Sequence, residues 1–313
     1  MLNARSQNLQ TIKTYFDPYL KTQLEEVYTV IANTPTKHGT YKRYDKGGTL
    51  VEEAVLSQNQ INEVHKIYYG SEWVLPSYSL VGKIHIVETY VNGTLVGLSE
   101  QYQYVGGKKC FLWQKTYNNK GEEIKSVEYY ESGVKSSSVQ VNGHCVEWYE
   151  NGQKSAEYTN KNGDIDGKFM AWHENGALKA QSIIVRGNRA GKGTYYFPNG
   201  VIQSEEEYNS MSILISSREY FMNSKPKYEK YAVGDNKFKE FTNDSVSGNK
   251  LSEIDLIMIN TDSNPELIIN GKRLIYYASG KIKEEEFYDN GRKTGKWKKY
   301  HEGGELKEVV NYE

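Results

Sequence analysis

The sequence contains few of the residues that stabilise small secreted domains or span membranes. Its 313 residues include only two cysteines, Cys110 and Cys145, which are too few for a disulfide framework and match no zinc-ligand spacing. The longest aliphatic run, residues 256–259, is far shorter than the roughly 18 apolar residues of a membrane-spanning helix. The opening residues, MLNARSQNLQ, lack the apolar stretch of a secretory signal. We therefore expect no membrane span and a cytoplasmic location.

An excess of charge of one sign is also missing. The chain has 39 Lys and Arg against 40 Asp and Glu, a formal net charge of −1. Proteins that bind nucleic acid carry a basic patch or excess, so no nucleic-acid partner is expected. The segment GNRAGKGT (residues 187–194) lacks the spacing of a phosphate-binding loop, and the six histidines show no metal-ligand spacing. We expect neither a metal nor another cofactor.

Glycine and tyrosine are abundant instead, with 28 and 27 residues against 8 phenylalanines. The glycines recur in pairs that are nine residues apart, and the first members at 143, 167 and 191 are 24 residues apart, as are those at 271 and 295. The pairs are Gly39/Gly48, Gly97/Gly106, Gly143/Gly152, Gly167/Gly176, Gly191/Gly200, Gly271/Gly280 and Gly295/Gly304. Self-similarity at a fixed period of this length indicates a repeat architecture.

An aromatic residue stands five positions after each repeat start, and we call it the ladder aromatic. Weaker copies of the repeat extend the series toward the N-terminal end and between residues 215 and 245. The ladder aromatics are Tyr15, Tyr44, Tyr68, Tyr102, Tyr129, Trp148, Trp172, Tyr196, Tyr220, Phe241, Tyr276 and Tyr300.

Each repeat has the pattern of a β-hairpin. Two segments of about six to eight residues, rich in aromatic and β-branched side chains, are bounded by Asn-Gly or Ser-Gly turns, as at 151–152 and 162–163. Short turns pair each strand with its neighbour in sequence, so we predict an all-β, elongated antiparallel meander with few or no helices. At about 10 Å per repeat, around twelve repeats would extend over roughly 120 Å.

Three stretches leave alternatives open. Residues 17–33 combine an Asp-Pro helix-start signal with a β-branched run, which favours a strand over a helix. Residues 224–270 are either an irregular insertion or degenerate repeats, and residues 70–82 are a second candidate insertion. By regularity, the chain divides into divergent N-terminal repeats (1–132), regular repeats (133–223), the irregular region (224–270) and C-terminal repeats (271–313).

The unit GKFMAWHENGALK and its copies GKGTYYFPNGVIQ, GKRLIYYASGKIK and GKWKKYHEGGELK resemble the MORN-repeat variant of bacterial proteins often labelled YwqK-type antitoxins. The resemblance is strong over 133–209 and 271–313. It implies a non-enzymatic array of β-hairpins that binds proteins, and the antitoxin label implies neutralisation of a partner toxin. Only Gly191-Lys192-Gly193 reproduces the G-x-G start of the parent MORN repeat, so its lipid binding is not expected to transfer.

Rigid aromatic side chains provide contact area at low entropic cost, so the ladder aromatics of the clearest repeats are the candidate binding residues. These are Trp148, Trp172, Tyr196, Tyr276 and Tyr300. The alternative is that they pack only against one another inside the ladder. No catalytic residues are expected. His173 and His301 share a repeat position with Tyr149 and Tyr277, which favours an aromatic role.

The acidic triplets 205–207 and 284–286 lie in strands whose residues alternate between faces, so they are interpreted as solvated surface. The leading hypothesis is a protein-binding scaffold, plausibly a bacterial antitoxin or immunity protein. A structural component that associates, or self-associates, through exposed edge strands is the second hypothesis. An enzyme with its site in the 224–270 region is the third.

Overall fold

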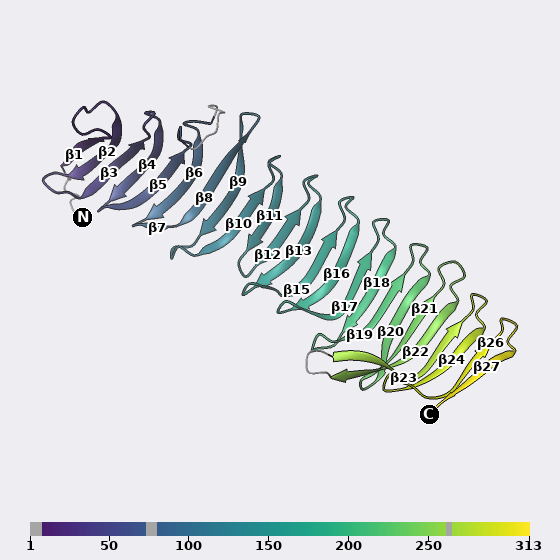
Figure 1. The fold of residues 1–313 in the computed structure, drawn as a ribbon. Helices are drawn as coiled ribbons and strands as arrows, with labels where there is room; N and C mark the ends of the chain where they lie inside the picture. Colours follow the sequence, from purple (N-terminus) through teal and green to yellow (C-terminus); the bar gives the residue numbers. More distant parts are fainter. Residues whose placement is uncertain (1–7, 73–79, 261–264) are drawn as a thin grey trace. The chain divides into compact units, whose positions relative to one another are not determined.

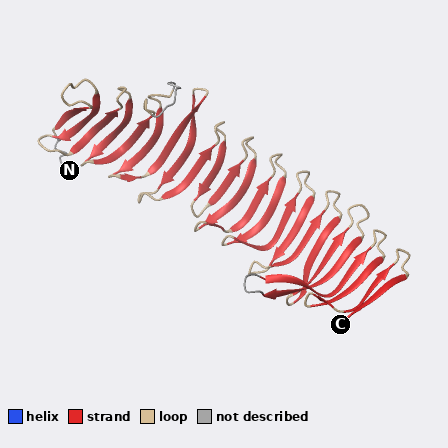
Figure 2. Ribbon diagram, in the orientation of Figure 1, coloured by secondary structure: helices blue, strands red, loops and turns tan. Residues whose placement is uncertain are grey.

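The computed structural model describes residues 8–72, 80–260 and 265–313, and every regular element within these ranges is a β-strand (Figures 1 and 2). The predicted all-β class is therefore confirmed. The chain divides into two compact units, the first made of Met1–Lys154 and Asn160–Gly163 and the second of Ser155–Thr159 and Asp164–Glu313.

Among the described residues, the first unit contains twelve complete strands. Their bounds are β1 Leu9–Tyr15, β2 Leu24–Ile31, β3 Lys37–Tyr44, β4 Leu50–Ser57, β5 Gln60–Tyr68, β6 Ile84–Val91, β7 Thr94–Leu95, β8 Gly97–Val105, β9 Lys108–Tyr117, β10 Glu123–Tyr129, β11 Lys135–Gln140 and β12 His144–Trp148.

The second unit contains the remaining strands. Of β13, residues 155–159 belong to the second unit, and residue 154 and residues 160–161 to the first. Their bounds are β13 Lys154–Lys161, β14 Asp164–Ile165, β15 Gly167–Trp172, β16 Leu178–Val185, β17 Asn188–Tyr196, β18 Ile202–Tyr208, β19 Leu214–Tyr220, β20 Pro226–Gly234, β21 Lys237–Asn243, β22 Lys250–Asn260, β23 Pro265–Tyr276, β24 Ile282–Asp289, β25 Arg292–Lys293, β26 Gly295–Tyr300 and β27 Leu306–Tyr312.

Within each unit, strands that follow one another in sequence pair with one another in antiparallel fashion (Figure 1). In the second unit β17 pairs with β18 from Gly191 opposite Tyr208 to Tyr196 opposite Ile202. The β18 strand then pairs with β19 in the same manner. The predicted hairpin meander is thus confirmed in each unit, and its contacts are local in sequence because every strand is held by its immediate neighbours.

The two ends of the hairpins use different turns, although both read as Asn-Gly in the sequence. At one end both turn residues have positive φ, as in Asn162 (54°) and Gly163 (93°), which is the geometry of a type I′ turn. At the other end only the glycine has positive φ, as in Gly200 at 82°. There Gly200 N donates to Phe197 O and Phe197 N donates to Val201 O, as expected for a type I turn closed by a glycine bulge.

A β-bulge accompanies almost every ladder aromatic. The pairing register shifts between Tyr195 and Tyr196, and again between Glu219 and Tyr220. Equivalent shifts occur immediately before Tyr15, Tyr44, Tyr68, Tyr102, Tyr129, Trp172, Tyr276 and Tyr300. A bulge bends a strand and increases its local twist. The strands are therefore expected to bend at most of the ladder aromatics.

Residues 17–33 form a turn and a strand, as favoured by the sequence. Asp17 Oδ1 accepts hydrogen bonds from the backbone N–H groups of Tyr19 and Leu20 at 2.8 and 3.0 Å. The aspartate therefore caps a tight turn, and the apolar residues after it form β2 and not a helix. The helical alternative was wrong because the β-branched run from Val27 pairs with strands on both sides.

Within residues 224–270 the described strands continue the meander, and β22 and β23 are longer than their neighbours. Strands β20 to β23 continue the regular pairing, and Lys237 lies opposite Ile257. Beyond that pair, β22 and β23 continue together to Asn260 opposite Pro265. We call residues 258–267 the arm, and Figure 1 shows β22 and β23 running past the ends of the neighbouring strands. Of the other candidate insertion, residues 73–79 lie outside the described ranges.

Candidate binding surface

Several ladder tyrosines are tied by their hydroxyl groups to the preceding hairpin. Tyr220 donates a hydrogen bond to Glu205, which lies fifteen residues earlier, at 2.7 Å. The same fifteen-residue bond joins Tyr68 to Glu53 at 2.8 Å, Tyr129 to Gln114 at 2.6 Å, Gln181 to Tyr196 at 3.1 Å and Tyr300 to Glu285 at 3.4 Å. We call the side of each unit that carries these bonds the ladder face.

The residue after the ladder aromatic forms a second bond, to the following repeat. Tyr277 donates from its hydroxyl to the backbone carbonyl of Tyr300 at 2.8 Å. His173 Nε2 lies 2.8 Å from the carbonyl of Tyr196, so this nitrogen carries the proton. The same bond joins Tyr69 to Tyr102 and Tyr130 to Trp148. His173 therefore donates the same hydrogen bond as the tyrosines at this repeat position.

The five candidate residues lie at equivalent places in their repeats and are all half-buried. Trp148 ends β12 in the first unit, whereas Trp172, Tyr196, Tyr276 and Tyr300 end β15, β17, β23 and β26 in the second. At least one strand separates each from the next within the second unit, so the structure places them in a row and not in one cluster. The hydroxyls of the three tyrosines are held by ladder bonds. These bonds fix the orientation of the three rings while part of each ring stays exposed.

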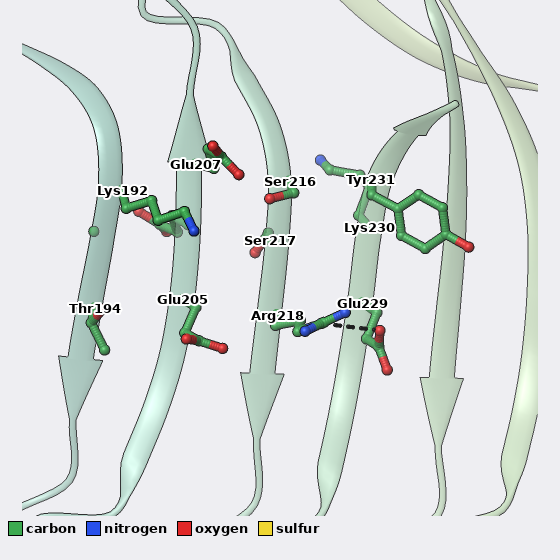
Figure 3. A pocket seen from close by; sticks show the side chains of 12 residues that line it. Lys192, Thr194, Glu205, Glu207, Ser216, Ser217, Arg218, Glu229, Lys230 and Tyr231 are labelled. Atoms are coloured by element: carbon green, nitrogen blue, oxygen red, sulfur yellow. Dashed lines mark hydrogen bonds and ion pairs between the residues drawn. The ribbon is translucent and has the colours of Figure 1, made fainter. Parts of the chain in front are cut away.

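A hollow of about 270 Å³ opens on strands β17 to β20 (Figure 3). Lys192 and Thr194 line it from β17, and Glu205 and Glu207 line it from β18. The small side chain of Ser216 stands on β19 directly opposite Glu207. The lining side chains around this serine, such as Lys192, Glu207 and Tyr231, are longer. The hollow therefore lies above the short side chain of Ser216.

The charges around this hollow are only partly paired. Arg218 Nε lies 3.2 Å from Glu229 on the next strand, and Figure 3 shows this pair. The attraction of Glu229 raises the pKa of Arg218 further above its already high value. Lys192 and Glu207, by contrast, have no ion pair within 4.0 Å among the described residues. The hollow can therefore accept polar groups of a partner, and its half-exposed wall includes Tyr231, which stacks on Phe241.

The opposite face carries a different recurring group, a glutamate, the tyrosine two residues later and a cation, which we call a trio. In the second unit Tyr208 donates to Glu206 at 3.0 Å, and Arg189 Nη1 donates to the same carboxylate at 2.8 Å. Tyr288 and Arg273 bond to Glu286 in the same manner, at 3.2 and 3.1 Å. Each carboxylate thus accepts from a hydroxyl and a cation on the face of the sheet.

The first unit has a trio whose cation is a histidine. Tyr90 donates to Glu88 at 3.0 Å, and His65 lies between Glu88 and Glu52 on the flanking strands. Burial lowers the pKa of His65, but the hydrogen bonds and charges of the two glutamates outweigh burial and raise its pKa to about 9. His65 is therefore a cation at neutral pH, like the arginines of the other trios.

These groups correct the interpretation of the acidic triplets as solvated surface. Glu286 is only 6% exposed and pairs with Arg273. Glu205 and Glu285 accept ladder bonds on the other face, and Lys272 and Lys298 hold the pKa of Glu285 below its usual range. Alternation of the triplets between faces was predicted correctly, but their partners were missed. The available signal was the pattern Glu-x-Tyr, which recurs at 88–90, 206–208 and 286–288.

Features typical of other classes of site were also sought in the described ranges. No cluster of three or more His, Cys, Asp or Glu side chains within them is placed to bind a metal ion. Nor does any described helix have the length and apolar character needed to cross a bilayer. Cys110 and Cys145 are free thiols, and Cys145 is fully buried.

Comparison with protein families identifies the repeat. The family model described as MORN repeat variant matches residues 37–57, 189–210, 269–290 and 293–313. The matches fall in both units and in both well-defined and divergent copies of the repeat. Among curated proteins, none shows significant sequence similarity to the chain.

Similar solved structures include a TcdB2-TccC3 complex, with 10% identity over 97% of this chain and 18% of that chain at a TM-score of 0.21. The Photorhabdus luminescens Tc holotoxin pore matches at 8% identity over 97% of this chain and 23% of that chain, with a TM-score of 0.18. A porin-like protein from Bacteroides uniformis matches at 8% identity over 85% and 93% of the two chains, with a TM-score of 0.15. The chain spans about a fifth of the length of the first two. Scores this low support no statement on fold or function.

Proposed function

The chain belongs to the MORN repeat variant family, and from this premise we propose that it is a non-catalytic, cytoplasmic scaffold that binds another protein. The ladder face is its proposed contact surface. The observation that carries this proposal is the fixing of half-exposed rings: Tyr196, Tyr276 and Tyr300 each have a hydroxyl held by a residue of the preceding hairpin. Side chains that are already ordered lose little entropy on binding, which favours affinity.

The hollow beside Tyr196 and Tyr220 adds a polar recess to this surface. Its unpaired Lys192 and Glu207 can form ion pairs with a partner, which would contribute orientation and specificity more than affinity. Aromatic anchors next to a polar recess are the usual composition of a protein interface. We therefore expect the partner to cover β17 to β20 of the second unit.

Two neighbouring tyrosines on β17 provide a matched test of the face. Tyr196 lies on the ladder face, and Tyr195 lies on the opposite face, where Arg189 is 5.5 Å from its ring. The chain is used to capture proteins from the cells that produce it, and the captured protein is then purified and titrated. Tyr196→Ala is expected to weaken binding at least tenfold and Tyr195→Ala less than threefold, since truncation of a central aromatic commonly costs about 2 kcal/mol. Equal loss in both variants, or loss only in Tyr195→Ala, would refute the ladder face as the contact surface.

The finer proposal is that the partner is a toxin and the chain its bacterial antitoxin or immunity protein. Support comes from the resemblance of the repeats to antitoxin-labelled proteins. The test is co-expression: a captured partner that arrests growth alone should do so no longer when the chain is present, and Tyr196→Ala should restore the arrest. A harmless partner would exclude this role and leave the scaffold proposal intact.

A second candidate function is a structural component of a larger assembly. Within the described ranges β27 pairs only with β26 and leaves one edge without a strand neighbour, and open edges support strand addition. Such a component should purify in a fixed stoichiometry with its neighbours or as a self-associated species. Light scattering at increasing concentration distinguishes this from a separable toxin and antitoxin pair.

A further inference from the structure

The last hairpin repeats the trio with one member missing. In β27, Tyr312 stands where Tyr208 and Tyr288 stand in their repeats, but the residue two places before it is Val310. Val310 lies opposite Trp297, just as Glu206 lies opposite Gly193 and Glu286 opposite Arg273. The strand register therefore places an apolar side chain where the other trios have a carboxylate.

The cation of this incomplete trio is Lys293. Lys293 precedes Gly295 by two residues, as Arg189 precedes Gly191, so the two cations occupy the same repeat position. Lys293 Nζ lies 4.4 Å from the centre of the Trp297 ring and 5.3 Å from that of Tyr312. Arg189 is placed likewise, 5.5 and 5.8 Å from the rings of Tyr195 and Tyr208, but it also bonds to Glu206.

Neither polar group of the incomplete trio has its counterpart's partner. Among the described residues, no carboxylate oxygen lies within 4.0 Å of Lys293 Nζ, whereas Glu206 lies 2.8 Å from Arg189. The hydroxyl of Tyr312 has no hydrogen bond within the same ranges, whereas that of Tyr208 donates to Glu206. An ammonium held over two rings and a free hydroxyl thus stand beside the position of an absent carboxylate.

A cavity of about 190 Å³ lies at this point, lined by Lys293, Trp297, Val310 and Tyr312. The glutamates at its rim are already near cations of the chain. Glu286 bonds to Arg273 at 3.1 Å and Glu308 to Lys299 at 2.9 Å. Glu284 lies directly opposite Lys299 in the strand register. The cations at the rim therefore offset the acidic side chains, and Lys293 is the one without a described carboxylate partner.

We propose that Lys293 and the hydroxyl of Tyr312 bind a carboxylate side chain of an acidic segment of the partner protein, which completes the trio from outside. The carboxylate would accept a hydrogen bond from each group, as Glu206 does from Arg189 and Tyr208. The proposal rests on the protein-binding function proposed above. It adds a second contact, on the face opposite the ladder face, and the acidic character of the segment of the partner that reaches it. The cavity is lined by side chains on the face of β26 and β27, so an acidic segment can reach it without displacing a strand.

The most direct test supplies the missing carboxylate from within the chain. Val310→Glu places a glutamate at the repeat position of Glu206, where it would pair with Lys293 and occupy the site. The probe is a fluorescein-labelled hexaglutamate peptide, and its binding is measured by fluorescence anisotropy at low salt. The Val310→Glu variant is expected to bind the peptide at least fivefold more weakly than the wild type, about the upper value for one exposed ion pair.

Val309→Glu is the matched control, because it adds the same charge to the same strand on the other face. Val309 is 44% exposed and lies opposite Lys298, which extends to Glu285 on the ladder face. This variant should keep peptide binding within twofold of the wild type. Circular dichroism of both variants establishes that each remains a β-sheet, so that loss of binding is assigned to the site.

Glu206→Val is the reciprocal variant and removes the internal carboxylate of a complete trio. It should expose Arg189 and raise the stoichiometry of the peptide from one to two per chain. The proposal is overturned if hexaglutamate does not bind the wild type, or if Val310→Glu and Val309→Glu weaken binding equally. A captured partner protein that binds Val310→Glu as tightly as the wild type would also overturn it, while leaving the scaffold function in place. Peptide binding that is lost only in Val310→Glu supports it even where the Tyr196 test fails.

Discussion

His65 Nδ1 lies 3.1 Å from Glu88 Oε2, and the other ring nitrogen lies 3.0 Å from Glu52 Oε1. Both ring nitrogens therefore donate to carboxylates, which requires the charged form of the histidine. The side chain of His65 is only 8% exposed, so the histidine itself is largely shielded from water. It links β4, β5 and β6 of the first unit.

The first prediction is a loss of stability at alkaline pH. The pKa of His65 is about 9 in the folded state against 6.5 for the free group. Its contribution to the free energy of unfolding is therefore complete below pH 6.5 and is lost as the pH rises through 9. His65 also lowers the pKa of Glu52 and Glu88, so the same contribution is lost on the acid side as the pH falls below 4.5 through their depressed values.

Urea unfolding of the wild type and His65→Gln measures this contribution at each pH. The difference in unfolding free energy between them should be roughly 1–2 kcal/mol near pH 6 and close to zero near pH 10. It is less than the full pKa difference because Glu52 and Glu88 stay partly exposed to water, which screens the charges. A difference that stays constant from pH 6 to 10 would show that His65 does not act as a cation.

The second prediction concerns the ladder bonds. Removing the hydroxyl in Tyr220→Phe deletes the bond to the charged Glu205, and the unfolding free energy should fall by about 1 kcal/mol. The same change in Tyr196→Phe deletes a bond to the neutral Gln181 and should cost about half as much, since bonds to charged groups are stronger. Chemical denaturation of both variants gives the comparison. The ladder would have no role in stability if both variants unfolded with the wild type.

The third prediction is that histidine and tyrosine are interchangeable after the ladder aromatic. His173→Tyr can donate to the carbonyl of Tyr196 as Tyr277 donates to that of Tyr300, so its unfolding free energy should stay within about 0.5 kcal/mol of the wild type. His173→Leu fills a similar space but cannot donate, and it should be about 1–2 kcal/mol less stable. Equal stability of the tyrosine and leucine variants would contradict the assigned bond.

The fourth prediction is that the arm can be removed without unfolding the sheet. Tyr276 reaches Glu253 at 3.5 Å over a separation of 23 residues, eight more than the usual fifteen. Replacing residues 258–267 by Asn-Gly joins the paired Ile257 and Ile268 through a two-residue turn and restores the separation of fifteen. The far-ultraviolet circular dichroism should be unchanged and the urea midpoint nearly so. Loss of the β-sheet signal would show that the arm is an integral part of the fold.

The same variant tests whether an activity resides in this region. If the chain carried an enzymatic site in 224–270, removal of the arm would alter it, whereas a scaffold that binds through β17 to β20 would keep its partner. Titration of the purified partner against the shortened chain gives the answer. Loss of partner binding would move the contact surface from the hollow to the arm.

The sequence predicted those features of the fold that depend on local chemistry. The glycine period gave the hairpins because only glycine readily adopts the positive φ found at Gly163 and Gly200. The β-branched run after Asp17 gave β2. The sequence did not distinguish the two turn types, because Asn-Gly suits both. At 162–163 the asparagine and the glycine both have positive φ, whereas at 199–200 only the glycine does.

The candidate site was predicted only in part. The positions of Tyr196 and Tyr300 in a ladder followed from the period, but their hydrogen-bond partners did not. Those partners lie on the preceding strand, where for example Glu205 lies opposite Arg218 and the register shifts between Glu207 and Tyr208. No local pattern of the sequence fixes such a register. The trios were missed because the place of the cation varies. Arg273 lies directly opposite its glutamate, whereas Arg189 lies further along the facing strand, where Gly193 is opposite Glu206.

The bond from Tyr277 to Tyr300 ends on a backbone carbonyl, which every amino acid possesses. The acceptor can therefore change from Tyr300 to the tryptophan at 148 with no loss of the tether, as Tyr130 demonstrates. The hydrogen bond that joins consecutive hairpins therefore does not depend on which aromatic side chain occupies the ladder position. A lineage could diversify its recognition residues one at a time, and a designer could do the same by randomising ladder positions while keeping the tyrosine or histidine that forms each tether, as Tyr277 and His173 do.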